Sequence, residues 1–253
     1  MAPASAAACR SKEGRRSHPF SRQAECTNLE PVHIVKREAA GVTKLYDKVS
    51  AFILGGGASS RMGKAKGLLE FGGQPLILRI ARLVEPLVLD VTAVGSPERY
   101  ADLGLRVIED QQFGGPGERT RTPGPLAGIA SALTATRMDW NLILACDLPY
   151  LTAEWVDWLL ARAKDSKRQI IMPRTAGGLE PLAAVYRREC AERITAALYR
   201  GIRKVTDAVE EFRIEVVDEH DWRHVNRDGR VLRNMNAPRD YEEAQRWLEA
   251  RHL

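Results

Sequence analysis

One stretch of the chain reads Ala51-Phe-Ile-Leu-Gly-Gly-Gly-Ala-Ser-Ser-Arg-Met-Gly-Lys-Ala-Lys-Gly67. The apolar run Val49–Leu54 predicts a buried strand, and this strand stops at three glycines and two serines. Arg61, Lys64 and Lys66 follow the glycines. Glycines let a backbone approach a ligand and point N–H groups at it, while lysine and arginine neutralise negative charge. The stretch therefore indicates a loop that binds polyphosphate.

Two familiar glycine motifs do not fit this loop. A Walker A motif ending at Gly63-Lys64 would need glycine at Ala58 and serine or threonine at Ala65. A dinucleotide fingerprint would need glycine at Ser60. A tight strand-to-helix turn without a ligand is the alternative, but the clustered cations argue against it.

The charge of the chain is uneven. Of a net charge of +5, residues 1–48 contribute +4, with nine lysines and arginines against five acidic residues. We expect residues 1–48 to be a disordered basic extension, because they show no periodicity, and residues 49–253 to form the folded domain. The near balance of charge in that domain argues against a nucleic-acid-binding surface.

Cysteine usage and hydropathy limit the setting of the protein. None of the four cysteines forms a C-x-x-C pair, so the sequence indicates neither a disulfide framework nor a zinc site. This cysteine usage is typical of a protein in a reducing cytoplasm. No apolar run approaches the roughly 20 residues of a membrane span. We therefore expect a cytoplasmic protein without a membrane partner.

Apolar runs of strand type alternate with stretches of helical spacing over most of the chain. This alternation predicts an α/β fold in three layers, with a mostly parallel central sheet covered on both faces. The expected strands after the first are 88–94, 105–108, 140–146, 169–172, 182–186 and 214–217. The expected helices are 75–85, 97–100, 124–136, 153–165, 188–199 and one from residue 238 onward.

Two aspartates, Asp110 and Asp147, each follow a predicted strand. Ligands of such sheets bind beyond the carboxyl ends of the strands. The two carboxylates and the glycine loop can therefore meet at one edge of the sheet. Each aspartate could instead only cap the helix that follows it.

Five sequence blocks together carry a family resemblance. In their order along residues 49–250 they resemble the molybdenum cofactor guanylyltransferases, whereas the first block alone resembles nucleotidyltransferases in general. The blocks are Leu54-Gly-Gly-Gly-Ala-Ser-Ser-Arg-Met-Gly63 with Lys66, Val107-Ile-Glu-Asp110, Gly124-Pro-Leu-Ala-Gly128, Cys146-Asp-Leu-Pro149 and Asn234-Met-Asn-Ala-Pro238.

The resemblance implies a Rossmann-like nucleotidyltransferase fold and a magnesium-dependent transfer of GMP from GTP to the phosphate of molybdopterin. It implies that Arg61, Lys66 and Asp147 are catalytic, with Asp147 binding Mg²⁺. It places Asn236, Arg203 and Lys204 on the acceptor side. The implied nucleotide-binding residues are Leu54, Gly55, Gly56, Gly57, Ser59, Lys66, Asp110, Gly124, Pro125 and Leu126.

Other readings stay open at this point. A cytidylyltransferase acting on molybdopterin or a related cofactor is one, and a catalytically inactive nucleotide-binding regulatory protein is another. Partners would be GTP, the molybdenum cofactor, and molybdoenzymes or proteins that deliver the cofactor. Two positions depart from the family pattern: Ala65, where an aspartate is common, and Glu180, where some members have histidine.

Overall fold

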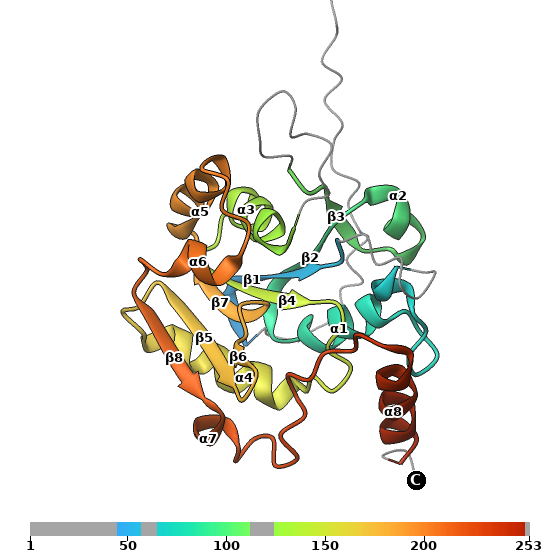
Figure 1. The fold of residues 1–253 in the computed structure, drawn as a ribbon. Helices are drawn as coiled ribbons and strands as arrows, with labels where there is room; N and C mark the ends of the chain where they lie inside the picture. The colour runs from blue at the N-terminus through green and yellow to red at the C-terminus, as the bar shows by residue number, and fades with distance from the viewer. Residues whose placement is uncertain (1–44, 57–64, 112–123, 251–253) are drawn as a thin grey trace, which may run out of the picture. The chain divides into compact units, whose positions relative to one another are not determined.

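Residues 45–56, 65–111 and 124–250 are described by the computed structural model, and within them eight strands form one sheet (Figure 1). Contacts divide the chain into Met1–His33 and Ile34–Leu253, and all described residues belong to the second unit. The expected extension 1–48 therefore lies almost entirely outside the described residues. Among the described residues, no helix combines the length and the apolar character needed to cross a membrane.

The strands follow the order β3-β2-β1-β4-β7-β5-β6, with β8 paired to β5. Pairing is parallel from β3 to β4 and between β5 and β8, whereas β7 and β6 run in the opposite direction. The prediction of a mostly parallel sheet is thus confirmed. The strands are β1 (Tyr46–Leu54), β2 (Val88–Val94), β3 (Arg106–Ile108), β4 (Trp140–Ala145), β5 (Ile170–Thr175), β6 (Gly178–Leu179), β7 (Ala183–Arg187) and β8 (Ile214–Asp218).

The first strand is longer than the predicted Val49–Leu54. It begins at Tyr46, whose N–H donates to Leu87 O at 2.8 Å and whose hydroxyl donates to Asp157 Oδ1 at 2.7 Å. The residues before Val49 are not buried, so the apolar pattern of the sequence could not show them as part of the strand.

Helices cover both faces of the sheet (Figure 1). Along β1, Ala51 and Ile53 pack with α1 and α4, while Phe52 and Leu54 pack with α3, α5 and α6. This alternation of side chains produces the three predicted layers. The helices are α1 (Leu76–Val84), α2 (Pro97–Tyr100), α3 (Pro125–Ala135), α4 (Ala153–Asp165), α5 (Cys190–Tyr199), α6 (Val205–Val209), α7 (Glu219–Trp222) and α8 (Pro238–Glu249).

The segment after the glycine stretch contains a short helical turn. Residues Lys66–Leu68 form the 3-10 helix η2, and Glu70 pairs with Pro75 in an isolated bridge. The side chain of Leu248 in α8 packs with Phe71 in a small separate core, which joins the C-terminal helix to this segment.

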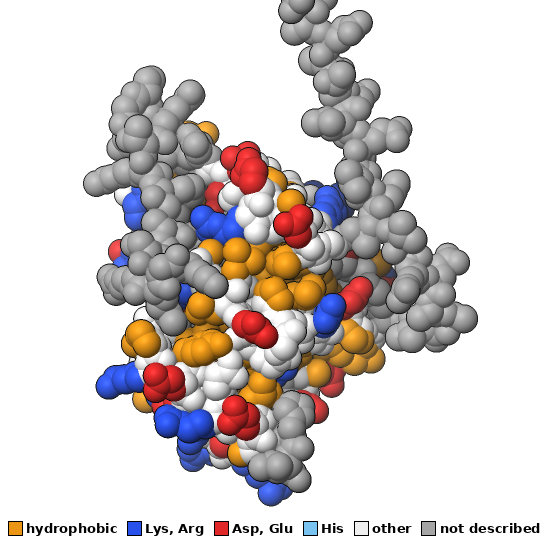
Figure 2. Space-filling model, turned by 90° about the vertical axis from the view of Figure 1, so that its right-hand side faces the viewer, with side chains coloured by type: hydrophobic (Ala, Val, Ile, Leu, Met, Phe, Trp, Pro, Cys, Tyr) orange, Lys and Arg blue, Asp and Glu red, His pale blue; other side chains and the backbone are white. Residues whose placement is uncertain are grey.

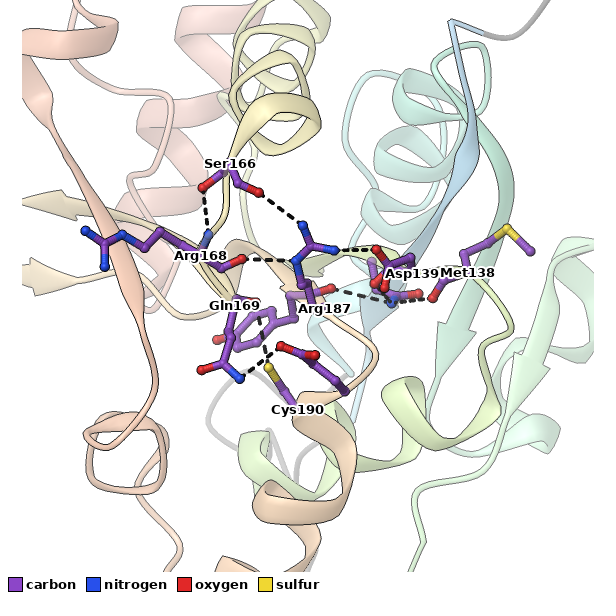
Figure 3. Close-up of polar contacts among 10 residues, drawn as sticks. Met138, Asp139, Ser166, Arg168, Gln169, Arg187 and Cys190 are labelled. Carbon is purple, nitrogen blue, oxygen red and sulfur yellow. Dashed lines mark hydrogen bonds and ion pairs between the residues drawn. The ribbon is translucent and has the colours of Figure 1, made fainter.

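Arg187, at the end of the antiparallel strand β7, contacts the segments before β4 and before β5 (Figure 3). The guanidinium of Arg187 donates to Ser166 O at 3.0 Å and to Arg168 O at 3.1 Å, and it pairs with Asp139. It also lies over the ring of Trp140, 4.2 Å from the centroid. These contacts are at the opposite end of the strands from the predicted site, so we assign them to the stability of the sheet.

The face drawn in Figure 2 carries lysine and arginine side chains interspersed with aspartate and glutamate, and hydrophobic side chains gather near its centre. The lysine and arginine side chains of the described residues form no continuous stripe on this face. The picture agrees with the balanced charge of residues 49–253.

Candidate active site

The carboxyl ends of β1, β2, β3 and β4 meet at one edge of the sheet, because these four strands are parallel. The strand β7 is antiparallel, so its amino end lies at the same edge, where Ala145 N–H donates to Leu182 O at 2.7 Å. This edge therefore receives the segments after residues 54, 108 and 145. The predicted convergence of the glycine loop, Asp110 and Asp147 on one edge of the sheet follows from this topology.

Two glycines, Gly55 and Gly56, follow β1 at this edge of the sheet. Gly55 N–H still belongs to the sheet and donates to Val94 O at 2.9 Å, while Gly55 O accepts a hydrogen bond from the hydroxyl of Tyr100 at 2.6 Å. Gly56 N–H has no acceptor among the described residues. It is therefore the first N–H after β1 that can donate to a ligand. The other predicted loop residues, Gly57, Ser59, Arg61 and Lys64, lie outside the described residues.

Three side chains from distant parts of the sequence meet at one ammonium group. Lys66 Nζ lies 2.7 Å from Asp147 Oδ2 and 2.7 Å from Asn236 Oδ1. The side chains of Lys66 and Asp147 are only 20% and 15% exposed, so the pair is shielded from bulk water. The structure thus brings together a predicted catalytic cation, the predicted metal ligand and a predicted acceptor-side residue.

Backbone contacts hold this group in place. Cys146 N–H donates to Leu54 O at 3.2 Å, which fixes the turn after β4 against the end of β1. Met235 N–H donates to Asp147 O at 3.0 Å, which fixes the segment before α8 to the same turn. These contacts hold the segment before α8 at the edge of the sheet. Asn236 therefore lies beside Lys66, although the two residues are 170 positions apart in the sequence.

The Asn236 segment is held by the first turn of α8. Asp240 Oδ2 accepts hydrogen bonds from Asn236 N–H at 3.0 Å and from Ala237 N–H at 2.8 Å. These backbone hydrogen bonds lower the pKa of Asp240. Asp240 was not among the predicted site residues, but an acidic residue three positions after a helix cap is a recognisable pattern.

The carboxylate of Asp110 rests on two glycine backbones. A β-carbon at Gly56 would lie 2.4 Å from Asp110 Oδ2, and one at Gly128 would lie 3.3 Å from Asp110 Oδ1. Burial, and then the neighbouring charge of Glu109, raise the pKa of Asp110. A side chain at Gly56 would therefore displace this carboxylate from its position beside the end of β1, and one at Gly128 would crowd it.

The Gly124–Gly128 block begins α3, with Gly124 as the cap and Pro125 in the first turn. Leu126 is fully buried and packs in the same core cluster as Leu54. In this structure both leucines fix α3 on the sheet, while Gly124, which is partly exposed, lies nearer to solvent. A direct nucleotide contact of these residues stays a prediction.

The two basic residues predicted on the acceptor side contact the α5–α6 region. Arg203 donates from Nη1 to Leu198 O at 2.7 Å, which closes the C-terminal end of α5. Lys204 precedes α6 and lies 3.4 Å from Asp207. These contacts give both residues a structural role, and their acceptor role stays a prediction.

The thiol next to Asp147 is not available as a nucleophile. Cys146 is buried, and burial together with the charge of Asp147 raises the pKa of its thiol to about 12. The thiolate is the reactive form of cysteine. The site is therefore suited to direct transfer between bound substrates, without a covalent intermediate on this cysteine.

The oxygen atoms around Lys66 Nζ are of the type that Mg²⁺ prefers. A carboxylate oxygen and an amide oxygen both lie 2.7 Å from the same nitrogen, so they already face a common cation. Magnesium is usually held by one or two carboxylates and keeps several waters. The donor set around Asp147 fits this ion.

Comparisons with known proteins agree with the sequence blocks. The model of the MobA-like NTP transferase domain matches residues 51–213. Over 199 residues the chain is 32% identical to a probable molybdenum cofactor guanylyltransferase of Pelotomaculum thermopropionicum, covering 78% of this chain and 92% of the relative. It is 38% identical over 157 residues to the molybdenum cofactor guanylyltransferase of Pseudomonas paraeruginosa, covering 61% of this chain and 76% of the relative.

A solved structure supports the fold. The molybdopterin-guanine dinucleotide biosynthesis protein A of Archaeoglobus fulgidus superimposes with a TM-score of 0.68 at 22% identity, covering 79% of this chain and 99% of that one. The match to residues 51–213 and the identity to the Pelotomaculum protein over most of both chains show that this chain belongs to the MobA-like NTP transferase family, as its sequence blocks indicated.

Proposed function

We propose that this chain transfers GMP from GTP to the terminal phosphate of molybdopterin and releases pyrophosphate, in a reaction that depends on Mg²⁺. The observation that carries the proposal is the convergence of Lys66, Asp147 and Asn236 beside the glycines that end β1. The names of the relatives support guanine as the base.

The proposed step is a direct displacement. An oxygen of the molybdopterin phosphate attacks the α-phosphorus of GTP, the bond from that phosphorus to the bridging oxygen of the β-phosphate breaks, and pyrophosphate leaves with the bonding electrons. Such a transfer depends mainly on positioning and on electrostatic stabilisation.

Each residue of the site has a part in this step. Gly56 N–H is available to a phosphate oxygen, and the ammonium of Lys66 would move from Asp147 towards the α-phosphate as negative charge develops there. Asp147 would hold Mg²⁺, which when bound neutralises phosphate charge. Asn236 would keep Lys66 aligned while Asp147 binds the metal.

The proposed site of action is the cytoplasm. Cys146 and Cys190 are free and buried in the structure, which is usual for proteins of a reducing compartment. Fractionation of cells that produce the protein at native level tests this part of the proposal.

The experiment that tests the activity uses the purified full-length chain with Mg²⁺, molybdopterin and each of the four common nucleoside triphosphates in turn. Pyrophosphate release and the mass of the pterin product are measured. We expect turnover with GTP and a product heavier by one GMP unit. Turnover with CTP alone would show a cytidylyltransferase instead, and GTP binding without any turnover would favour a regulatory nucleotide-binding protein.

A further inference from the structure

We propose that Tyr100 is a positioning residue for the bound nucleotide, because its hydroxyl holds the end of β1 at Gly55 and lies beside Gly67 in η2. The inference rests on the proposed function, since it concerns the nucleoside triphosphate of the same site. Tyr100 itself touches no reacting atom in this account. It acts through Gly56, which follows Gly55, and through Lys66, which precedes Gly67.

Tyr100 is the last residue of α2 and is completely buried. Its hydroxyl donates to Gly55 O at 2.6 Å, the first carbonyl after β1. Gly55 N–H is already bonded to Val94 O, so both polar groups of this peptide position are satisfied. The hydroxyl therefore fixes the orientation of the peptide that carries the N–H of Gly56, which has no acceptor within the described ranges.

Three glycines from three segments surround the same phenol ring. A β-carbon at Gly55 would lie 2.4 Å from the Tyr100 hydroxyl, and one at Gly67 would lie 3.1 Å from it. A β-carbon at Gly95 would lie 3.3 Å from Tyr100 Cε2, and Gly95 has a φ of +153°, which also favours glycine. Glycine, which has no side chain, thus occupies three positions around this ring.

The position of this hydroxyl links it to the chemistry of the site. Gly67 follows Lys66 directly, and Lys66 Nζ lies 2.7 Å from Asp147 Oδ2. Gly56 follows Gly55 directly. The buried hydroxyl thus bonds to the residue before Gly56, whose N–H can bind phosphate. It also lies beside the residue after Lys66, whose ammonium can neutralise phosphate charge.

The hydroxyl keeps its proton, and so can donate, at neutral pH. Burial, followed by the nearby Cys146, raises the pKa of Tyr100 to about 12. Removing the hydroxyl would leave the buried Gly55 carbonyl without its partner, and an unpaired buried carbonyl drives local rearrangement. That rearrangement would displace Gly56 and Lys66 rather than the distant core.

The test compares Tyr100→Phe with the wild type by calorimetric titration of GTP, CTP and ATP, in addition to steady-state kinetics. The ring stays, so packing against Gly67 and Gly95 is kept. We expect the Kd of the preferred nucleotide to rise about tenfold, the size expected for one buried hydrogen bond. The KM for molybdopterin should change less than about twofold, because Tyr100 holds the end of β1, whereas the residues predicted on the acceptor side are Asn236, Arg203 and Lys204.

Tyr46→Phe is the matched control. Tyr46 also donates its hydroxyl to a backbone carbonyl, that of Asp157 at 3.1 Å, but at the other end of β1. It should lower stability without changing nucleotide affinity. A second route to the same contact is Gly67→Ala, whose new methyl group would meet the Tyr100 hydroxyl and should weaken nucleotide binding in the same way.

The results separate this inference from the proposed function. If Tyr100→Phe and Gly67→Ala bind nucleotide as tightly as the wild type and lose only melting temperature, Tyr100 is a core residue and the inference is wrong. If affinity falls but CTP is the nucleotide bound, the positioning role stands and the guanylyl assignment fails. A wild-type chain that binds none of the three nucleotides would refute both.

Discussion

Replacing Asp147 by asparagine tests whether this residue acts in catalysis or only holds the structure together. The change keeps the shape of the side chain and an oxygen that can accept from Lys66, but it removes the negative charge. The ammonium of Lys66 keeps its second partner, Asn236 Oδ1 at 2.7 Å. The backbone carbonyl of residue 147 would still accept from Met235 N–H. The fold should therefore survive the change.

The expected cost in stability follows from the exposure of the ion pair. Exposed pairs contribute up to about 1 kcal/mol, while removing one partner of a buried pair costs about 3–5 kcal/mol. With side chains 20% and 15% exposed and a neutral acceptor retained, we expect a loss of about 1–3 kcal/mol. For a domain of this size that corresponds to a fall in Tm of about 2–12 °C.

The expected loss of activity is much larger. Asparagine cannot replace a carboxylate as a ligand that offsets the charge of Mg²⁺, so kcat should fall by about 100-fold or more. The assay is pyrophosphate release at saturating GTP and molybdopterin over a series of Mg²⁺ concentrations, with Tm measured on the same samples.

Asp218→Asn is the matched control for this prediction. Asp218 ends β8 and pairs with Arg174 at 2.6 Å, so the variant also removes a carboxylate from an ion pair at the end of a strand. Turnover of this control should stay at the wild-type level. The reasoning is refuted if Asp147→Asn keeps wild-type turnover, or if its Tm falls by far more than about 12 °C, since Asp147 would then be structural.

Three further predictions concern the residues around this site. Asp110→Asn should unfold at a higher urea concentration than the wild type at neutral pH. Burial raises the pKa of Asp110, so the charged carboxylate destabilises the fold once the pH rises above 3.8, the ordinary pKa of an aspartate. The gap in stability should close as pH falls towards 3.8, and a gap that does not change with pH would contradict the account. Gly128→Ala would put a methyl group 3.3 Å from Asp110 Oδ1. It should raise the KM for GTP and lower the free energy of unfolding by about 1 kcal/mol. Gly177→Ala, whose methyl group would lie 3.4 Å from its nearest neighbour, should change neither quantity. Asp240→Ala removes the acceptor of two N–H groups at the start of α8, so Tm should fall by about 2–4 °C and kcat should fall with it as Asn236 loses its position. An unchanged kcat would show that Asn236 does not depend on Asp240.

The sequence predicted the layers and the edge of the site because both depend on local pattern. Apolar runs located the parallel strands. The residues that follow these strands within two positions, Gly55, Asp110 and Asp147, had to meet where parallel strands end. The reversal of β7 was not visible, because a fully buried strand shows the same apolar run in either direction.

The sequence did not show the contacts that tie the site together. Tyr100 lies in a four-residue helix with no periodic pattern, and its role depends on three glycines that only the fold gathers around it. The pairing of Lys66 with Asn236 joins residues 170 positions apart, and no local rule predicts such a contact. The resemblance places Arg203 on the acceptor side, and only the structure shows that its guanidinium also closes the end of α5.

The most direct test of the central claim is to follow each phosphate of GTP separately. The purified chain is incubated with Mg²⁺, molybdopterin and GTP radiolabelled at either the α- or the γ-phosphate, and the pterin product is separated from pyrophosphate. We predict that the α-label appears in the pterin product and the γ-label in pyrophosphate. Label from the γ-phosphate in the pterin product, or α-label that stays in free nucleotide, would contradict a guanylyl transfer at the site built by Lys66, Asp147 and Asn236.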